Sequence, residues 1–152
     1  PQRSLFENII LSQIAQTNER ILLVRGKPGA APMPQSNPNI EIVSYLPGEV
    51  LQEAIQSAGL IICRSGYSSI MDLIKLGKHA LLVPTSGQTE QEYLAQYLTE
   101  KKWFMSCRQE QFDLAKLSAL IEQFGFADFP ELDLQQYKSV LARQLQEMSP
   151  EL

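Results

Sequence analysis

The sequence has few cysteines, one histidine, no excess of basic charge and no long apolar run. Its two cysteines, Cys63 and Cys107, are too few for a disulfide-stabilised scaffold, and both lie in apolar stretches typical of strands, which favours reduced, buried thiols. Because His79 is the only histidine, a histidine metal cluster or a Ser-His-Asp triad would have to form around that one residue. His79 begins an apolar run, and this position favours a structural role.

The sequence also lacks the features of a nucleic-acid-binding, membrane-spanning or secreted protein. It has 13 lysines and arginines against 17 acidic residues, a net charge of -4 and a pI of about 5.0. This balance disfavours nucleic acid or an anionic membrane as the main partner. No apolar segment approaches the ~20 residues that cross a bilayer, and the first residues do not form a signal peptide. We therefore expect a soluble, cytoplasmic protein.

What is present is enough apolar sequence for one domain. The chain has 152 residues, of which 44% are hydrophobic and 20% are charged. A chain of this length most often forms one domain and buries roughly 70% of the surface that its unfolded form exposes. We expect one globular domain over residues 1–152 and no second core.

Apolar runs of strand length alternate with apolar stripes of helical spacing along the whole chain. The pattern predicts strands at 20–25, 40–46, 60–63, 80–84 and 103–107, and helices at 5–14, 50–58, 68–76, 90–102, 112–124 and 134–148. Near-continuous apolar strands separated by helices are typical of a parallel sheet that is covered on both faces. The expected fold is an α/β, Rossmann-like, doubly wound domain.

In such a sheet, ligands bind beyond the carboxyl ends of the strands, so the loops at that edge are where chemistry is expected. The most informative one is 64–69, in which Gly66 permits close backbone approach and the hydroxyls of Ser68 and Ser69 stand at a helix start. It could hold a phosphate, and Asp72 one turn later could accept hydrogen bonds from sugar hydroxyls. Alternatively, Ser69 to Asp72 fits a capping box. Spacing alone favours the cap.

The loop at 84–92 is long and polar, with amide and carboxylate groups that suit a polyol. Its alternative interpretation is again a cap, because Thr89 to Glu92 fits the same pattern. That interpretation leaves Gln91 with no evident structural role. The segment from Gly26 to Gly29 lacks the full phosphate-loop motif, and a plain turn is expected there.

Arg64 has two interpretations that the sequence does not separate. It follows a predicted buried strand, and its fork of donors could bind a diphosphate or pair with an acid on a neighbouring element or domain.

Several of these segments together resemble a known family. The order and spacing of five segments resemble the donor-binding half of a GT-B glycosyltransferase, and most closely the family 28 C-terminal domain of MurG-type N-acetylglucosaminyl transferases. The segments are Cys63-Arg64-Ser65-Gly66, Asp72, Leu76-Gly77-Lys78, Leu81-Leu82-Val83-Pro84 and Glu90-Gln91-Glu92-Tyr93-Leu94-Ala95. The likeness covers residues 42–103 well and the remainder loosely.

The resemblance implies a nucleotide-sugar donor, with UDP-sugar as the expected class, and gives roles to individual residues. Ser65, Gly66 and the helix start at Ser68 and Ser69 would lie beside the donor diphosphate, near Arg64. Asp72 would hold the ribose hydroxyls. Gln91 would contact the transferred sugar, with Glu92 where such enzymes commonly have a second glutamine, a departure that bears on which sugar is used.

The resemblance also extends to the beginning of the chain. Leu46, with Tyr45, matches the segment whose backbone meets the uracil ring, and Gln2 and Arg3 match the tail of a glycine-rich loop. The family's first strand would precede Pro1, which implies a fragment.

The acceptor site and the catalytic base would lie in an N-terminal domain that this sequence does not contain. The resemblance therefore implies that this domain binds the donor without completing hexosyl transfer, and no catalytic residue is assigned. No metal or cofactor is expected, because loop donors and helix N-termini could stabilise the diphosphate and no Asp-x-Asp motif occurs. The parent protein could associate peripherally with a membrane.

Three alternatives remain open at this point. The chain could be one subunit of a split glycosyltransferase, with a separate acceptor-binding subunit. It could belong to a nucleotide-sugar epimerase or hydrolase of GT-B-like fold. It could also be a non-catalytic module in which Asp72 and Glu92 only cap helices. The expected helix at 134–148 would pack on this domain or cross toward the missing one.

Overall fold

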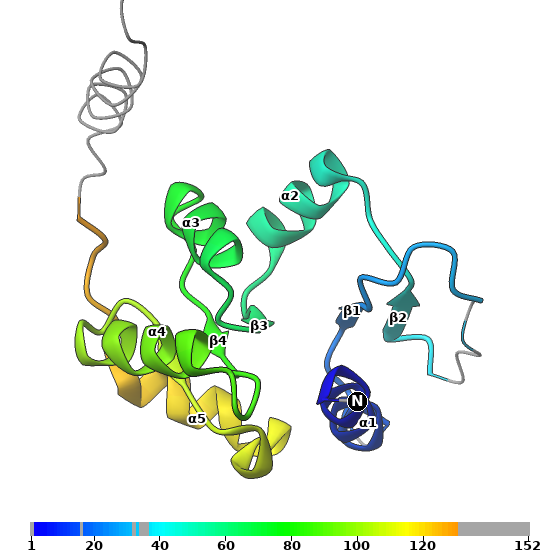
Figure 1. Cartoon of the computed structure of the whole chain (residues 1–152). Helices are drawn as coiled ribbons and strands as arrows, with labels where there is room; N and C mark the ends of the chain where they lie inside the picture. The colour runs from blue at the N-terminus through cyan, green and yellow to red at the C-terminus, as the bar shows by residue number, and fades with distance from the viewer. Residues whose placement is uncertain (1, 16, 32, 34–36, 131–152) are drawn as a thin grey trace, which may run out of the picture.

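The computed structural model describes residues 2–15, 17–31, 33 and 37–130, with the side chains of Gln2 and Arg3 excepted. Helices and strands alternate as predicted (Figure 1). The strands are β1 (Ile21–Val24), β2 (Ile40–Val43), β3 (Ile62–Cys63), β4 (Leu81–Leu82) and β5 (Met105–Ser106). The helices are α1 (Gln2–Ile14), α2 (Gly48–Ser57), α3 (Tyr67–Lys75), α4 (Thr89–Glu100), the 3-10 helix η1 (Gln109–Gln111) and α5 (Leu114–Phe124). The helix predicted at 134–148 lies outside the described residues.

All strand pairs in the described part of the chain are parallel, and they form two sheets. One sheet contains β1 and β2, and the other has the order β3-β4-β5. In the larger sheet Ile62 is in register with Leu81, and Leu81 with Met105. The strands are shorter than predicted because the ladder hydrogen bonds end before the apolar runs do. The parallel arrangement expected from the sequence is confirmed.

Helices cover both faces of the larger sheet. On one face α3 and α4 pack on Leu82 and Phe104 of the sheet region, and on the other α1 and α5 pack on Leu81 and Val83. Successive residues of a strand point to opposite faces, so the neighbours Leu81 and Leu82 belong to different clusters, and both are fully buried. This is the doubly wound arrangement. The carboxyl ends of β3 and β4 lie at one edge of the sheet, and a polar loop follows each of them.

The residues expected to be structural have that role. His79 Nδ1 lies 2.8 Å from the carbonyl oxygen of Trp103, and its ring stacks between Phe126 and Phe129 with both centroid distances 4.5 Å. Because a carbonyl only accepts, Nδ1 is the donor in this hydrogen bond. The histidine therefore fastens the segment after α5 to the sheet.

The two cysteines are free thiols and are half-buried, whereas the sequence predicted buried ones. Neither Cys63 nor Cys107 forms a disulfide. Burial raises the pKa of the Cys63 thiol to about 12 and also raises the pKa of Cys107. Among the described residues, no group of three or more candidate metal ligands is found. None of the helices in this part of the chain has both the length and the apolar character needed to cross a membrane.

Helix α1 links the two sheets. Phe6 packs with Phe112 in an edge-to-face contact, with ring centroids 5.3 Å apart. Glu7, the next residue of the helix, forms ion pairs with Arg25 at 2.6 Å and Lys27 at 2.5 Å, just after β1. Through Glu7 the helix therefore ties the end of β1 to the rest of the domain.

Candidate functional site

The turn after β3 is tied to the start of α4. Ser65 is fully buried, and its hydroxyl donates to the carbonyl oxygen of Gln91 at 2.8 Å. The two polar loops singled out in the sequence therefore lie together at the carboxyl edge of the sheet. Since Ser65 has no exposed surface, its contribution to the site is to position the turn.

Gly66 opens the surface at the start of α3. It is the N-cap residue, with φ -76° and ψ 139°, and a Cβ built on it would meet no atom within 4 Å. Any residue adopts this conformation and the space beside it is empty, so the fold itself does not require glycine here. Because Gly66 has no side chain, the first-turn N–H groups of α3 are left uncovered on the side where a Cβ would stand.

The capping box predicted from Ser69 to Asp72 is wrong. Helix α3 begins at Tyr67, three residues earlier than that pattern requires, and its N-cap Gly66 makes no side-chain hydrogen bond. Asp72 is exposed, and no hydrogen bond or ion pair of its carboxylate is found within the described residues. The local structure therefore leaves Ser68, Ser69 and Asp72 exposed on one helix that starts at Gly66.

Gln91, which the sequence left without a structural role, has two side-chain hydrogen bonds. Its Oε1 accepts from the Thr85 N–H at 3.0 Å, and its Nε2 donates to Gln88 Oε1 at 2.5 Å. These contacts tie the first turn of α4 to the loop 85–88. The expectation that Gln91 has no structural duty is therefore wrong, although its predicted contact with a sugar is untested.

Glu92 does act at a helix start, with a different partner from the predicted one. Its Oε1 accepts from the Gly87 N–H at 2.9 Å, while Gln88 is the N-cap and makes no side-chain cap. Gly87 has φ +81°, a conformation that favours glycine. The helix begins one residue earlier than in a capping box headed by Thr89, and the Glu92 carboxylate reaches back to Gly87.

Arg64 is held by the protein itself. Its NH1 donates to the carbonyl oxygens of Val83 and Pro84, both at 3.0 Å, and its NH2 donates to Gln109 Oε1 at 2.6 Å. The guanidinium also lies over the Phe6 ring, 4.4 Å from the centroid. Partial burial lowers the pKa of Arg64, against an opposing effect of Glu110.

These contacts give Arg64 partners that neither sequence interpretation named. Carbonyl oxygens and an amide occupy the fork, where a diphosphate or an acid was expected. Gln109 is 5% exposed and is a residue that the sequence analysis missed. No signal in the sequence pairs it with Arg64, because the two are 45 residues apart. Arg64 thus joins the carboxyl ends of β3 and β4 to η1.

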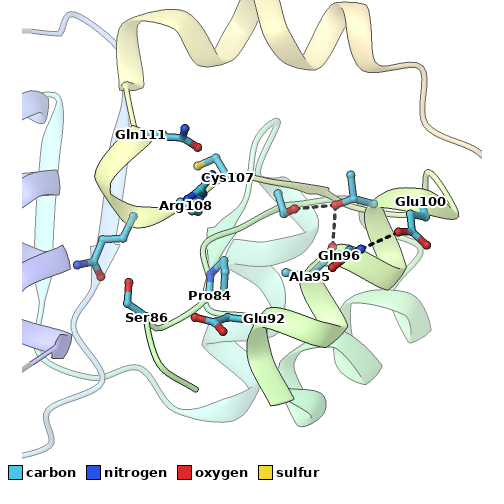
Figure 2. Close-up of a pocket in the computed structure, with 12 residues that line it drawn as sticks. Pro84, Ser86, Glu92, Ala95, Gln96, Glu100, Cys107, Arg108 and Gln111 are labelled. Carbon is cyan, nitrogen blue, oxygen red and sulfur yellow. Dashed lines mark hydrogen bonds between the residues drawn. The ribbon is translucent and has the colours of Figure 1, made fainter. Parts of the chain in front are cut away.

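A cavity of about 590 Å³ opens beside the loop 85–88, between α4 and the segment after β5. Figure 2 shows Ser86, Glu92 and Arg108 around it, with Gln96 and Glu100 joined by a 3.0 Å hydrogen bond at its far end. The Ser86 hydroxyl also donates to Glu110 at 2.9 Å. Of the predicted site residues, Glu92 lines this cavity, whereas Gly66, Asp72 and Gln91 do not.

The remaining predicted residues lie on the other sheet or outside the described side chains. Leu46 follows β2 and is half-buried, beside Tyr45, which is 55% exposed. Within the described residues no hydrogen bond joins Leu46 to the turn at Gly66. Gln2 begins α1, but the side chains of Gln2 and Arg3 are outside the description.

The ion-pair group at the end of β1 was also missed. Burial alone would raise the pKa of Glu7, but hydrogen bonds from Lys27 and Arg25 together hold it below its usual value. The segment from Gly26 to Gly29 is the plain turn that was predicted, with the Ala30 N–H donating to Lys27 O at 3.1 Å. The sequence signal that could have indicated this group is the presence of two basic residues, Arg25 and Lys27, just after an apolar strand.

Comparison with known proteins identifies relatives of this chain. Residues 4–131 match the family model described as "Glycosyltransferase family 28 C-terminal domain". No curated protein sequence matches significantly.

Solved structures share the fold. The glycosyltransferase SnogD from Streptomyces nogalater has a TM-score of 0.55 at 15% identity, over 74% of this chain and 28% of its own. The kitacinnamycin glycotransferase has a TM-score of 0.59 at 16% identity, over 95% of this chain and 35% of its own. The spinosyn forosaminyltransferase SpnP has a TM-score of 0.55 at 16% identity, over 95% and 36%. This chain therefore spans about a third of the length of these proteins.

Proposed function

Because this chain belongs to the glycosyltransferase family 28 C-terminal domain family, we propose that it binds a nucleotide-sugar donor, specifically a UDP-sugar. In the parent protein the bound donor would transfer a hexosyl group to an acceptor held by an N-terminal domain. The observation that carries this proposal is the open start of α3. Gly66 has free space where a side chain would be, and no side chain caps the helix.

The donor diphosphate would lie against the first turn of α3. The first N–H groups of a helix have no intrahelical partner, and the helix dipole favours an anion there. A glycine N-cap lets phosphate oxygens approach the backbone more closely than a residue with a Cβ would. This arrangement would neutralise the departing nucleoside diphosphate through fixed N–H donors and needs no metal or other cofactor.

The nucleoside part of the donor and its phosphates would contact exposed side chains around that turn. Asp72 would accept hydrogen bonds from the ribose hydroxyls, and Ser68 and Ser69 would donate to the phosphates. The uracil would lie near the backbone of Leu46, with Gln2 and Arg3 at the start of α1.

Gln91 and Glu92 would face the transferred hexose from the first turn of α4, beside the loop 85–88. Both side chains also brace this loop. Each has hydrogen-bonding capacity left, because an amide and a carboxylate make more bonds than the ones found here. Ser65 and Arg64 would act by holding the two loops in place. Without the acceptor domain the chain would bind donor and complete no transfer.

Calorimetric titration of the folded chain with UDP, with GDP and CMP as controls, tests this proposal. We expect selective UDP binding that an Asp72→Asn substitution weakens by about tenfold or more, as for loss of hydrogen bonds to a charged group. Glu122→Gln is the matched control, because it removes one exposed carboxylate from α5, a helix on the opposite face. Equal affinity for the three nucleotides, or the same affinity in both variants, would count against the proposal.

A further inference from the structure

The loop 85–88 forms two hydrogen bonds with the helix that follows it. The Thr85 N–H donates to Gln91 Oε1 at 3.0 Å, and the Gly87 N–H donates to Glu92 Oε1 at 2.9 Å. Both acceptors lie in the first turn of α4. These short-range bonds order the loop relative to α4, and they do not fix it relative to any other element.

One further hydrogen bond joins the loop to a different element. The Ser86 hydroxyl donates to Glu110 Oε1 at 2.9 Å, although the two residues are 24 positions apart. Glu110 belongs to η1, and Figure 2 shows Ser86 beside the turn that carries Arg108 and Gln111. Among the described residues this is the only hydrogen bond that connects the loop to an element other than α4.

The short helix η1 is itself anchored on both sides of Glu110. Gln109 is buried, and its Oε1 accepts from Arg64 NH2 at 2.6 Å. The same guanidinium donates to the carbonyl oxygens of the two residues that precede the loop. Phe112, the residue after η1, is buried in the core. The backbone that carries the Glu110 carboxylate is therefore held by the fold.

Glu110 is an ionised acceptor near neutral pH. Its pKa is lowered by a hydrogen bond from its own backbone N–H, by the hydrogen bond from Ser86 and by the charges of Arg108 and Arg64, with desolvation opposing them. Because a carboxylate only accepts, the single hydroxyl proton of Ser86 is committed to Glu110. Toward a ligand Ser86 then offers lone pairs and no proton. This favours a partner that donates, such as a sugar hydroxyl.

We propose that Glu110 positions the loop 85–88 for the hexose of the donor, acting through Ser86 and without contact to the nucleotide. The inference rests on the donor function proposed above, in which Gln91 and Glu92 face that hexose. Because the loop is held before the donor arrives, binding of the hexose does not have to order it. Glu110 is thus a positioning residue that raises the affinity for the hexose part of the donor. The UDP part, expected at the start of α3, gains nothing from it.

Three variants separate the hydrogen bond from other roles of this residue. Glu110→Ala removes the acceptor. Glu110→Gln removes the charge and keeps an amide oxygen that can accept from Ser86. Gln111→Ala is the matched control, because it truncates the neighbouring exposed residue of η1, whose side chain makes no hydrogen bond within the described part of the chain.

Amide hydrogen exchange resolved by residue tests the positioning without any nucleotide. In Glu110→Ala the amides of Thr85 and Gly87 should exchange at least about threefold faster than in wild type, relative to the Val83 amide in the sheet. Glu110→Gln and Gln111→Ala should leave this ratio within about twofold of wild type. Exchange in Glu110→Ala that equals wild type would overturn the proposal, whether or not the chain binds a nucleotide.

Calorimetric titration with UDP, UDP-glucose and UDP-N-acetylglucosamine tests the consequence for the donor. In Glu110→Ala the affinity for the two UDP-hexoses should fall about three- to tenfold, as for one lost hydrogen bond, while UDP affinity is unchanged. Glu110→Gln should keep most of the wild-type affinity. Ser86→Ala combined with Glu110→Ala should lose no more than the larger single loss, because both changes break the same hydrogen bond.

Three results would overturn the positioning role and leave the donor function in place. The first is an unchanged UDP-hexose affinity in Glu110→Ala, or an equal loss for UDP. The second is a loss in Glu110→Gln as large as in Glu110→Ala, and the third is losses from Ser86→Ala and Glu110→Ala that add in the double variant. A wild-type chain that binds none of the three ligands would instead overturn the donor function, and amide exchange alone would then decide whether Glu110 holds the loop.

Discussion

The two sheets of this domain use similar apolar strands and obtain different amounts of burial from them. Around β4, Leu81, Leu82 and Val83 have no exposed surface, because helices cover both faces and strands flank both edges. In β1 the run Ile-Leu-Leu-Val contains no buried residue. Burial is therefore determined by the neighbours that a strand has. In the β1–β2 sheet Ile40 alone is buried, and ion pairs of Glu7 tie the end of β1 to α1, while the β3–β5 sheet has helices packed on both faces.

The largest expected effect is a difference in stability loss when one leucine of each sheet is replaced by alanine. Leu82→Ala should destabilise the chain by about 3 kcal/mol, through lost transfer free energy and the cavity left behind. Leu22→Ala, at a 40% exposed site, should cost less than about 1 kcal/mol. Urea denaturation followed by circular dichroism measures both. Equal losses would break the comparison, because they would show that β1 is buried in solution.

The next effect concerns the contacts that brace the site within the larger sheet. Arg64→Lys should destabilise by about 1–3 kcal/mol, because an ammonium group cannot reproduce the fork that reaches Val83, Pro84 and Gln109. Thermal unfolding measures the loss, and Arg108→Lys, on an exposed arginine, is the control. If the Arg64→Lys variant is as stable as wild type, Arg64 does not brace the two loops.

A smaller effect tests the polar attachment of the other sheet. Glu7→Gln should lower stability near neutral pH by about 1–2 kcal/mol, since Arg25 and Lys27 would then lie together without their carboxylate. The pKa of Glu7 is lower in the folded chain than its usual 4.5, so the ion pairs stabilise the fold above about that pH. Their contribution is lost as pH falls toward the lowered pKa.

Denaturation of wild type and Glu7→Gln over a range of pH checks this sign. The difference between them should be largest near neutral pH and should shrink on acidification. Lys116→Gln, which removes an exposed ion pair with Asp113, should show little difference at any pH. A Glu7→Gln difference that grows as the pH falls would contradict the assignment.

The alternation of elements could be predicted from the sequence because apolar period and turn residues are local signals. The strands centred near Leu22, Leu81 and Met105 and the helices between them follow from such signals. The structural role of His79 was predicted for the same reason, since it begins an apolar run. The two polar loops at the carboxyl edge could be found because parallel strands bring their ends together.

The details of the candidate site could not be predicted, because they depend on atoms distant in sequence or on a shift of one to three residues in a helix start. A cap pattern fits Ser69 to Asp72, but the helix starts at Tyr67, and no local rule distinguishes the two starts. The bonds of Gln91 depend on how its loop folds back on Thr85. The partners of Arg64 come from β4 and η1, which only the tertiary structure brings together.

The measurement that tests the central claim most directly is UDP binding by Gly66→Ala, with stability measured on the same sample. The fold does not need glycine at this position. Loss of a good N-cap and reduced freedom of the unfolded chain have opposite effects, so stability should change by less than about 1 kcal/mol. If a diphosphate lies against this turn, the added methyl group should weaken UDP binding by about tenfold or more. A folded Gly66→Ala variant that binds UDP as tightly as wild type would contradict the proposed donor site.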